Sequence, residues 1–317
     1  NVSGILPLLA LYAFAGYRLI PAIQSIFASV TSIKFYLPTI ELLYRDLSKV
    51  ENALPYSHDN EPIKPITPSR LIELKTVNFT YPNASESTLR GLSLRIQANT
   101  TVGFVGLTDS GKTTLADIVL GLLFPDCGRL MVDEVEITHV NVRAWYQSLG
   151  YVPQQIFLAD DTITHNIAFG IPDQDINHAA VEAAARIANL HDFVTHELPH
   201  GYRTLVGDRG VRLSGGQCQR IGIARALYHD PVVLILDEAT SSLDGITEQV
   251  ITEAINNLAH KKTNIIIAHR LSTVKQCDVI YMIENGQIVG HGTYAGLIES
   301  NPQFRKMASV KWSETYQ

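Results

Sequence analysis

The chain has 317 residues, of which 46% are hydrophobic and 18% are charged, a composition that allows a sizeable buried core and argues against wholesale disorder. Its formal net charge of −6 argues against broad nucleic-acid binding, which needs basic patches, but not against a local nucleotide site. The three cysteines are far apart and lack the spacing of a metal site, which favours a reduced, cytosol-facing domain.

Residues 1–50 predict a membrane-spanning helix with a cytosolic extension. The first 36 residues carry only two charged side chains, Arg18 and Lys34, and about 20 apolar residues are enough to cross a bilayer. Charges become frequent from Glu41 onward, as expected where a helix leaves the membrane, and Pro21 is expected to kink the helix. The alternative is a long buried helix of a soluble protein. Because no starting Met and no charged segment precede the apolar residues, we expect a fragment that begins within a longer protein, and not a signal peptide.

Residues 51–69 contain four prolines among polar residues and predict an extended linker. A second domain is expected over residues 70–317, where short strands alternate with helices. Within it, residues 71–74 and 92–96 alternate between apolar and polar side chains, which is typical of half-buried strands. Continuous apolar runs suit the central strands of a parallel sheet and occur at 101–105, 232–236 and 264–268. The sequence therefore predicts an α/β fold.

A phosphate-binding loop is predicted between Gly106 and Thr113, where the sequence fits the pattern GxxxxGK followed by Ser or Thr in full. The loop follows a predicted strand and precedes a predicted helix over 114–123, which is the context that the pattern requires. Glycines let backbone N–H groups point at phosphate oxygens, and the helix N-terminus adds partial positive charge. Lys112 is expected to reach the β and γ phosphates, and Thr113 to bind Mg²⁺. The nucleotide-binding residues predicted here are Gly106, Asp109, Ser110, Gly111, Lys112, Thr113 and Thr114.

Two consecutive carboxylates, Asp237 and Glu238, follow the apolar run at 232–236. A carboxylate at the carboxyl end of a central strand suits Mg²⁺, so we expect Asp237 to be a metal ligand. Glu238 is then placed to polarise the attacking water as a general base. Such a pair alone is often a surface feature, but beside a phosphate-binding loop it indicates nucleotide hydrolysis.

Residues 213–217 read Leu-Ser-Gly-Gly-Gln and open a predicted helix over 219–228. Together with the phosphate-binding loop, this segment resembles the signature motif of ABC ATPases, and the resemblance covers about residues 70–310. It implies a P-loop ATPase domain with a parallel-sheet core, an antiparallel β subdomain and a helical subdomain. It also implies that the domain binds ATP and Mg²⁺.

Other positions match further motifs of this family. Tyr81 resembles the aromatic residue that stacks on adenine, and Gln154 resembles the glutamine that contacts Mg²⁺ and water. Asp244 falls in a segment that resembles the D-loop, and His269 resembles the switch histidine near the γ phosphate. The resemblance thus implies that Glu238, His269 and Gln154 are catalytic and that Thr113, Gln154 and Asp237 bind the metal. Taken singly, these residues have plainer interpretations: a strand-end aromatic, a loop residue, a helix cap and a core histidine.

In this family two ATPase domains enclose two ATP molecules, and the phosphate-binding loop of one domain faces the signature motif of the other. The resemblance therefore implies a second ATPase domain as partner, in a homodimer or a heterodimer. The γ phosphate bound by the partner would be contacted by the Ser214 hydroxyl and by the backbone amides of Gly215 and Gly216 at a helix N-terminus. Gln217 belongs to the same predicted binding set.

Two segments, 161–170 and 206–210, resemble the exporter branch of the family, the second being its X-loop, which contacts the membrane domain. The apolar helix resembles the last transmembrane helix of a half-transporter, and residues 17–23 resemble bacterial flippases for lipid-linked oligosaccharides. The resemblance implies a multi-pass protein of the cell (inner) membrane with a cytoplasmic ATPase domain. Its partners would be the lipid bilayer and a transported substrate, such as a lipid-linked oligosaccharide or another lipid, and not nucleic acid.

Other functions remain open at this point. A soluble ABC ATPase acting on nucleic acid or the ribosome predicts a coiled-coil insertion or tandem ATPase domains, and no apolar N-terminal span. A module that binds ATP without hydrolysing it predicts the loss of Glu238 or His269, and both residues are present. Within the exporter branch, lipid A flippases and peptide or drug exporters also remain possible.

Asp109 departs from the family pattern, in which most members have glycine at this position of the loop. Because the loop amides must face the phosphates, we expect the Asp109 side chain to face outward, where solvent and salt screen its charge. Aspartate also adopts the left-handed backbone conformation more readily than most residues, so the loop need not be strongly strained.

Overall fold

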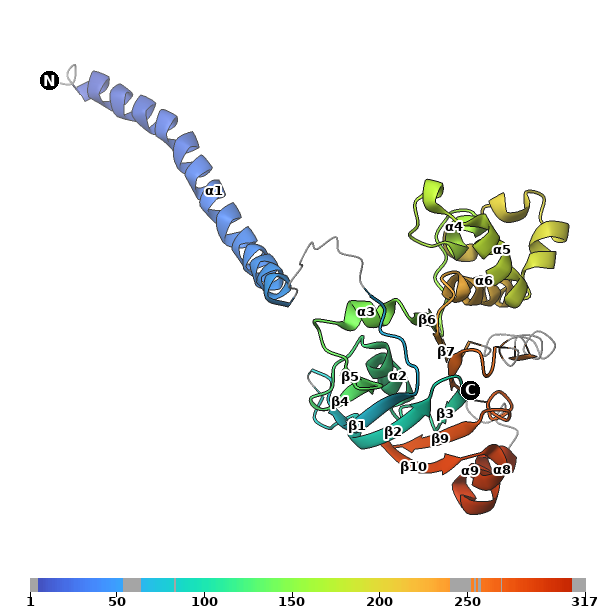
Figure 1. Cartoon of the computed structure of the whole chain (residues 1–317). Helices are drawn as coiled ribbons and strands as arrows, with labels where there is room; N and C mark the ends of the chain where they lie inside the picture. Colours follow the sequence, from blue (N-terminus) through green and yellow to red (C-terminus); the bar gives the residue numbers. More distant parts are fainter. Residues whose placement is uncertain are drawn as a thin grey trace. The chain divides into compact units, whose positions relative to one another are not determined.

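The computed structural model describes residues 5–53, 64–82, 84–239, 252–253, 255, 258–268 and 270–309. The chain divides into two compact units, residues 1–62 and 63–317. A single long helix makes up the described part of the first unit, and the second contains both sheets and the remaining helices (Figure 1).

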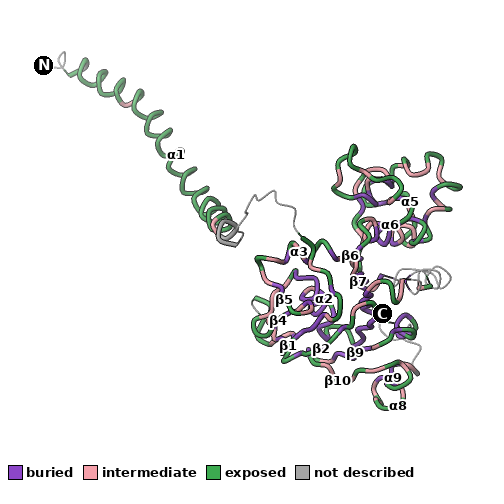
Figure 2. Tube along the Cα trace, in the orientation of Figure 1, coloured by how far each residue is buried: buried purple, intermediate pink, exposed green. Residues whose placement is uncertain are grey.

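Helix α1 (Ile5–Ala53) has 49 residues and continues through Pro21 and Pro38 without a break, although it bends along its length (Figure 1). Its side chains are exposed on every face, including the many large apolar ones (Figure 2). Among the described residues, α1 is the one helix long and apolar enough to cross a membrane, over Pro7–Ser48, and none of its most apolar stretch is buried. The helix is thus confirmed, and the membrane crossing and a kink placed at Pro21 stay predictions.

The linker predicted over 51–69 is described only in part. Its first three residues belong to α1, residues 54–63 lie outside the described residues, and residues 64–68 belong to no helix or strand. The Ile66 amide donates to the carbonyl of Ala144 (3.0 Å), so this last part runs alongside helix α3 (Val142–Tyr146).

A six-stranded sheet forms the centre of the second unit, in the order β10-β9-β3-β8-β7-β6. Its four interior strands and β6 run parallel, and β10 is antiparallel to β9. The continuous apolar runs of the sequence become the fully buried strands β3, β7 and β8, because these strands are covered on both faces. The strand bounds are β3 (Thr101–Val105), β6 (Leu149–Val152), β7 (Val233–Asp237), β8 (Thr263–Ile267), β9 (Val279–Glu284) and β10 (Gln287–Gly292).

A four-stranded antiparallel sheet lies beside it in the order β2-β1-β4-β5. Its strands are β1 (Leu71–Phe79), β2 (Leu89–Gln97), β4 (Cys127–Val132) and β5 (Val135–Glu136). Buried and exposed side chains alternate along β2, as the sequence pattern predicted for a half-buried strand. The buried side chains of this sheet and of one face of the six-stranded sheet form one core with helix α2 (Lys112–Leu120) and with Trp145, whose indole N–H donates to the carbonyl of Val119 (2.8 Å). The other face of the six-stranded sheet contributes to a second core.

A helical lobe is built from α4 (Ile163–Ile167), α5 (His178–Ile187) and α6 (Gly215–Leu227), which pack on one another. Arg225 of α6 ties this lobe together. Its guanidinium donates to the carbonyls of Asn166 (2.7 Å) and Phe157 (2.8 Å) and lies over the ring of Phe169, 4.6 Å from its centroid. Single helical turns occur at Asp173–Asp175, Phe193–Glu197, Gly201–Arg203 and Asp208–Gly210, and α8 (Tyr294–Ser300) and α9 (Pro302–Ser309) follow β10.

Two helices differ in their ends from the sequence prediction. Helix α2 ends at Leu120 and not at residue 123, because Gly121 adopts a left-handed conformation (φ 76°) and its N–H bonds back to the carbonyls of Asp117 and Ile118. Helix α6 begins at Gly215, four residues earlier than predicted, because Ser214 and Gln217 form a capping box in which each side chain accepts from the other's backbone N–H.

Asp133, in the turn between β4 and β5, fixes the start of the second unit. Its carboxylate accepts from the backbone amides of Ser69 (2.9 Å), Arg70 (2.9 Å) and Leu71 (2.8 Å), and from the Ser69 hydroxyl (2.7 Å). Burial by itself would raise the pKa of Asp133, but these hydrogen bonds outweigh it and lower the pKa to about 2.

We expect Asp133→Asn to lower the free energy of unfolding by about 1.5–3 kcal/mol at neutral pH, the range for hydrogen bonds to a charged group. Because the pKa of Asp133 is lower in the folded state, its stabilisation is complete above the unfolded pKa of about 4 and is lost as pH falls toward about 2. Urea unfolding of both proteins at pH 7 and pH 3 measures this, and a stability gap that does not shrink at pH 3 would contradict it.

Candidate functional site

The phosphate-binding loop occupies the turn between β3 and α2, residues 106–111, as predicted. A Cβ atom at Gly106 would lie 2.2 Å from the carbonyl oxygen of Ile283, so only glycine fits there. Gly111 precedes α2 with φ 100°, a conformation that glycine adopts at little cost. Asp109 also has a positive φ, 61°, which confirms that aspartate takes the left-handed conformation in this loop.

Lys112 is buried at the first position of α2, with only 4% of its surface exposed. Its ammonium donates to the carbonyls of Gly106 (3.0 Å) and Leu107 (2.7 Å), so its head lies within the curve of the loop. Burial lowers the pKa of Lys112, and the negative charges of Glu238, Asp237 and Asp109, in that order, partly oppose this effect. The cation is thus held beside three carboxylates.

An open cavity of about 480 Å³ lies above the loop. It brings together residues that are far apart in the sequence, from the loop, the start of α2, the end of β1, the segment after β6 and the end of β7. The lining residues are Tyr81, Thr88, Thr108, Asp109, Ser110, Gly111, Lys112, Thr113, Thr114, Gln154 and Glu238. Most of the residues predicted from the loop and its surroundings therefore meet in one place.

The two consecutive carboxylates differ in their surroundings. Asp237, at the end of β7, is buried, and its Oδ1 atom has no hydrogen-bond partner among the described residues. Burial raises the pKa of Asp237 to about 6, with Glu238 and Asp117 adding to the rise and Lys112 and Tyr151 opposing it. An unpartnered buried carboxylate oxygen is costly, so this atom is suited to receive a cation.

Glu238 borders the cavity and has a left-handed backbone conformation, φ 49°, which is rare for glutamate. Its Oε2 atom accepts from the side-chain amide of Gln154 (2.7 Å), and its backbone N–H donates to the carbonyl of Ile267 (3.0 Å). The structure thus places Glu238, the predicted general base, in direct contact with Gln154, the glutamine predicted to contact Mg²⁺ and water.

Tyr81 lines the cavity with 40% of its surface exposed and packs edge-to-face against Phe79, with ring centroids 5.0 Å apart. Its hydroxyl is 3.2 Å from the Thr114 hydroxyl, at the start of α2. The ring is therefore available at the mouth of the site, where its stacking on adenine stays a prediction.

The signature residues lie elsewhere. Ser214 caps α6, and none of the four residues Ser214, Gly215, Gly216 and Gln217 lines the cavity of this chain. Asp244 and His269, assigned from the resemblance to the D-loop and to the switch histidine, lie outside the described residues.

Comparison with known proteins agrees with this site. The family model described as "ABC transporter" matches residues 89–241, which include the phosphate-binding loop, the signature and both carboxylates. The chain belongs to the ABC transporter family. Its second unit has the fold of an ABC ATPase domain and binds ATP.

Proteins named as exporters and flippases are among those similar to this chain. The chain is 40% identical over 250 residues to the ATP-dependent lipid A-core flippase of Chromobacterium violaceum, covering 79% of this chain and 42% of that protein. It is 37% identical over 297 residues to the heterocyst differentiation ATP-binding protein HepA of Nostoc sp., covering 93% and 47%. A solved structure of a bacterial Atm1-family ABC exporter with ATP bound matches with a TM-score of 0.75 and 34% identity, covering 86% and 47%. The chain thus spans less than half the length of these relatives. The names of the flippase and of the exporter disfavour the alternative of a soluble ABC ATPase.

Four residues at or near the ATP cavity were not predicted as site residues from the sequence. Thr88 and Thr108 line the cavity, and Tyr151 and Asp117 lie close enough to Asp237 to affect its pKa. Burial raises the pKa of Tyr151 to about 12, so it stays a neutral hydroxyl beside Asp237. Tyr151 lies three residues before Gln154 and Asp117 one turn after Thr113, so proximity to motifs was the available signal. Thr88 had none, because it comes from the other sheet.

Asp109 is exposed, as expected for an outward side chain, but it also borders the cavity and its charge reaches Lys112. Because solvent screens an exposed charge, we expect Asp109→Gly to tighten ATP binding by less than about threefold, which is under about 0.7 kcal/mol. Nucleotide titration of both proteins at low and at physiological salt is the measurement. A tenfold tightening that shrinks as salt rises would show that the carboxylate faces the phosphates.

Proposed function

We propose that this chain forms a transmembrane helix and the ATPase domain of an ABC exporter or flippase, and that ATP hydrolysis at the cavity drives a substrate across the membrane. The observation that carries the proposal is the meeting of Lys112, Glu238 and Gln154 at one cavity above a glycine-bounded loop. A charged group for phosphate, a carboxylate base and an amide that orients it are the parts that phosphoryl transfer to water requires.

Phosphate binding would change the partners of Lys112. Its ammonium now donates to two loop carbonyls, and the incoming phosphate oxygens offer it negative charge in a buried setting. The N-terminus of α2 and the loop amides add donors at the same place. Affinity for ATP therefore depends on the loop keeping its shape while the lysine shifts from carbonyls to phosphate.

The residues present fit Mg²⁺. The unpartnered Oδ1 of Asp237 and the exposed hydroxyl of Thr113 are oxygen ligands of the kind that this ion prefers, and Gln154 offers a third. No group of three or more His, Cys, Asp or Glu side chains that could hold a metal occurs in the part of the chain that the structure describes. Phosphate oxygens and water would then complete the coordination shell of the ion. When bound, the ion would neutralise charge on the phosphates.

Glu238 is proposed to accept a proton from the attacking water. Gln154 donates to one of its carboxylate oxygens (2.7 Å), and Glu238 borders the cavity in which the attacking water would bind. Tyr81 is proposed to stack on the adenine ring. The roles of His269 beside the γ phosphate and of Asp244 in the D-loop rest on the family resemblance.

A second ATPase domain is proposed as partner, because the signature residues at the start of α6 do not contribute to the cavity of their own chain. Their hydroxyl and amide donors would complete the site of the partner, and the partner's donors would complete this one.

The protein is proposed to be a multi-pass protein of the cell (inner) membrane with its ATPase domain in the cytoplasm. The cargo is proposed to be a lipid or lipid-linked oligosaccharide, in keeping with the similarity to a lipid A-core flippase.

We expect Glu238→Gln to leave ATP binding nearly unchanged and to lower turnover by roughly 10²–10⁴-fold, the range for losing a general base. The substitution keeps the size of the side chain and removes only its basicity. ATP titration and phosphate release measured on the same preparation test this.

Lys112→Ala is the matched comparison, because it should weaken ATP binding itself by removing a positive charge from the phosphates. Turnover of Glu238→Gln within about threefold of the unmodified protein, well short of the general-base range, would remove Glu238 from the proposed role. Unchanged ATP affinity in Lys112→Ala would remove the loop from phosphate binding.

A further inference from the structure

The hairpin formed by β9 and β10 turns at Asn285 and Gly286, directly beside the phosphate-binding loop. Both turn residues are left-handed, with φ 47° and 75°. This is the conformation that a two-residue Asn-Gly hairpin turn adopts, since its twist matches that of the strands. The turn is therefore a short and rigid one.

Gly286 joins three parts of the second unit through its backbone. Its N–H donates to the carbonyl of Ser110 in the phosphate-binding loop (3.0 Å), and its carbonyl accepts from the amide of Arg90 in β2 (3.0 Å). The hairpin turn thus connects the loop to the edge strand of the antiparallel sheet.

The packing around Gly286 leaves no space for a side chain. A Cβ atom there would lie 2.1 Å from the carbonyl oxygen of Thr88 and 3.0 Å from the Cα atom of Leu89. Thr88 lines the ATP cavity, and the Cα atom of Gly286 is only 3.6 Å from the Cβ position of Gly111. A side chain at this position must displace the backbone of the cavity wall or of the loop, because neither neighbouring atom belongs to a flexible side chain.

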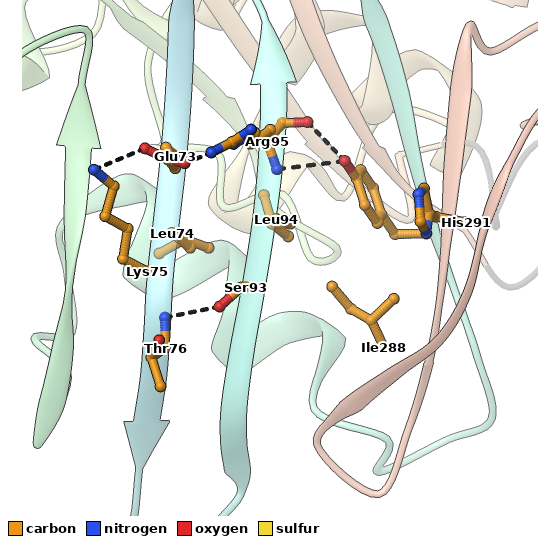
Figure 3. Close-up of a pocket in the computed structure, with 10 residues that line it drawn as sticks. Glu73, Leu74, Lys75, Thr76, Ser93, Leu94, Arg95, Ile288 and His291 are labelled. Atoms are coloured by element: carbon orange, nitrogen blue, oxygen red, sulfur yellow. Dashed lines mark hydrogen bonds and ion pairs between the residues drawn. The ribbon is translucent and has the colours of Figure 1, made fainter.

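The body of the hairpin is also attached to β2. The Tyr281 hydroxyl donates to the carbonyl of Arg95 (2.7 Å) and accepts from the Arg95 amide (3.3 Å). Figure 3 shows Arg95 on β2 and His291 on the neighbouring hairpin. The His291 ring of β10 stacks on Tyr281, with centroids 5.7 Å apart and planes inclined by 17°. The hairpin is thus attached to β2 at two places, through Gly286 at its turn and through Tyr281 in its body. These attachments hinder it from sliding past the antiparallel sheet, so its turn has a fixed place.

A fixed hairpin turn determines the direction of one loop amide. The carbonyl of Ser110 and the N–H of Gly111 belong to the same peptide unit, and in a planar trans peptide these two groups point in opposite directions. Because Gly286 holds the Ser110 carbonyl toward the hairpin, the Gly111 N–H is directed away from it. Gly111 lines the cavity, where such an amide can meet a phosphate oxygen.

We propose that Gly286 is a positioning residue for ATP binding, which acts by holding the Ser110–Gly111 peptide in the orientation that phosphate requires. The inference rests on the proposed phosphate-binding role of the loop. It predicts that crowding the hairpin turn weakens the binding of ATP without removing any group that touches ATP.

Gly286→Ala tests this against Gly91→Ala, with both made in the full chain in detergent. Gly91 lies in β2, is also left-handed (φ 62°) and has no atom within 4 Å of its Cβ position. Both substitutions thus carry the conformational cost of a left-handed alanine, and only that at Gly286 crowds the loop. We expect Gly286→Ala to raise the ATP Kd about tenfold, the size of one hydrogen bond of about 1.4 kcal/mol, and Gly91→Ala to change it by less than about twofold.

The ATPase KM should rise in parallel with the Kd. Turnover at saturating ATP should stay within about twofold, because a high ATP concentration compensates for weaker binding when the lost contact only positions ATP. A merely structural role would instead lower the active fraction, and hence turnover, at an unchanged KM. Tyr281→Phe loses an attachment of the hairpin body and keeps the turn contacts, so it should lower the melting temperature and raise the Kd by clearly less than Gly286→Ala does.

Equal ATP affinities for Gly286→Ala and Gly91→Ala would overturn the inference. If Gly286→Ala does not fold, Gly286→Asn replaces it, because asparagine tolerates the left-handed conformation better and still carries a Cβ. Failure of both to fold would assign the turn to fold stability and also overturn the inference. Lys112→Ala separates this inference from the proposed phosphate-binding role of the loop. Normal ATP affinity in Lys112→Ala would remove the role of the loop itself. Weakened ATP binding in Lys112→Ala together with normal ATP affinity in Gly286→Ala would remove only the role of the hairpin.

Discussion

A buried ammonium group is the constraint on which the nucleotide site depends. Lys112 is almost fully enclosed, and a buried cation must be matched by nearby negative or dipolar groups. The loop supplies two carbonyls at hydrogen-bond distance, and Glu238 and Asp237 supply charge from the end of β7. Because its carbonyls turn toward the lysine, the loop can present amides elsewhere, so one side chain organises both kinds of backbone group.

Local motifs made the centre of the site predictable from sequence. The loop is a contiguous segment whose glycines have individual steric reasons, and the two carboxylates follow an apolar run that could only be a buried strand. The left-handed Asp109 was also predictable, since it follows from the intrinsic preference of aspartate. Helix ends were less predictable, because the cap at Ser214 and the left-handed Gly121 depend on which hydrogen bonds form locally.

Contacts that depend on sheet order could not be predicted in this way. Thr88 borders the site because the antiparallel sheet lies beside β9, and Gly286 meets Ser110 because β9 pairs with β3. The sequence shows that each of these segments is a strand or a turn, but not which strands are neighbours. The Asn-Gly pair at 285–286 signals a hairpin, and only the order of strands in the sheet reveals what that hairpin touches.

The arginine at the end of α6 has a mechanical consequence. Arg225 binds the backbone of Asn166 and Phe157 and covers the ring of Phe169, while the rings of Phe157 and Phe169 are both more than half exposed. Two segments of the helical lobe, one at Phe157 and one at residues 166–169, are therefore fastened to the helix that begins with the signature motif. Because Arg225 holds the backbone beside both rings, a partner that contacts either exposed ring also contacts a segment joined to the helix that carries the signature motif at its other end.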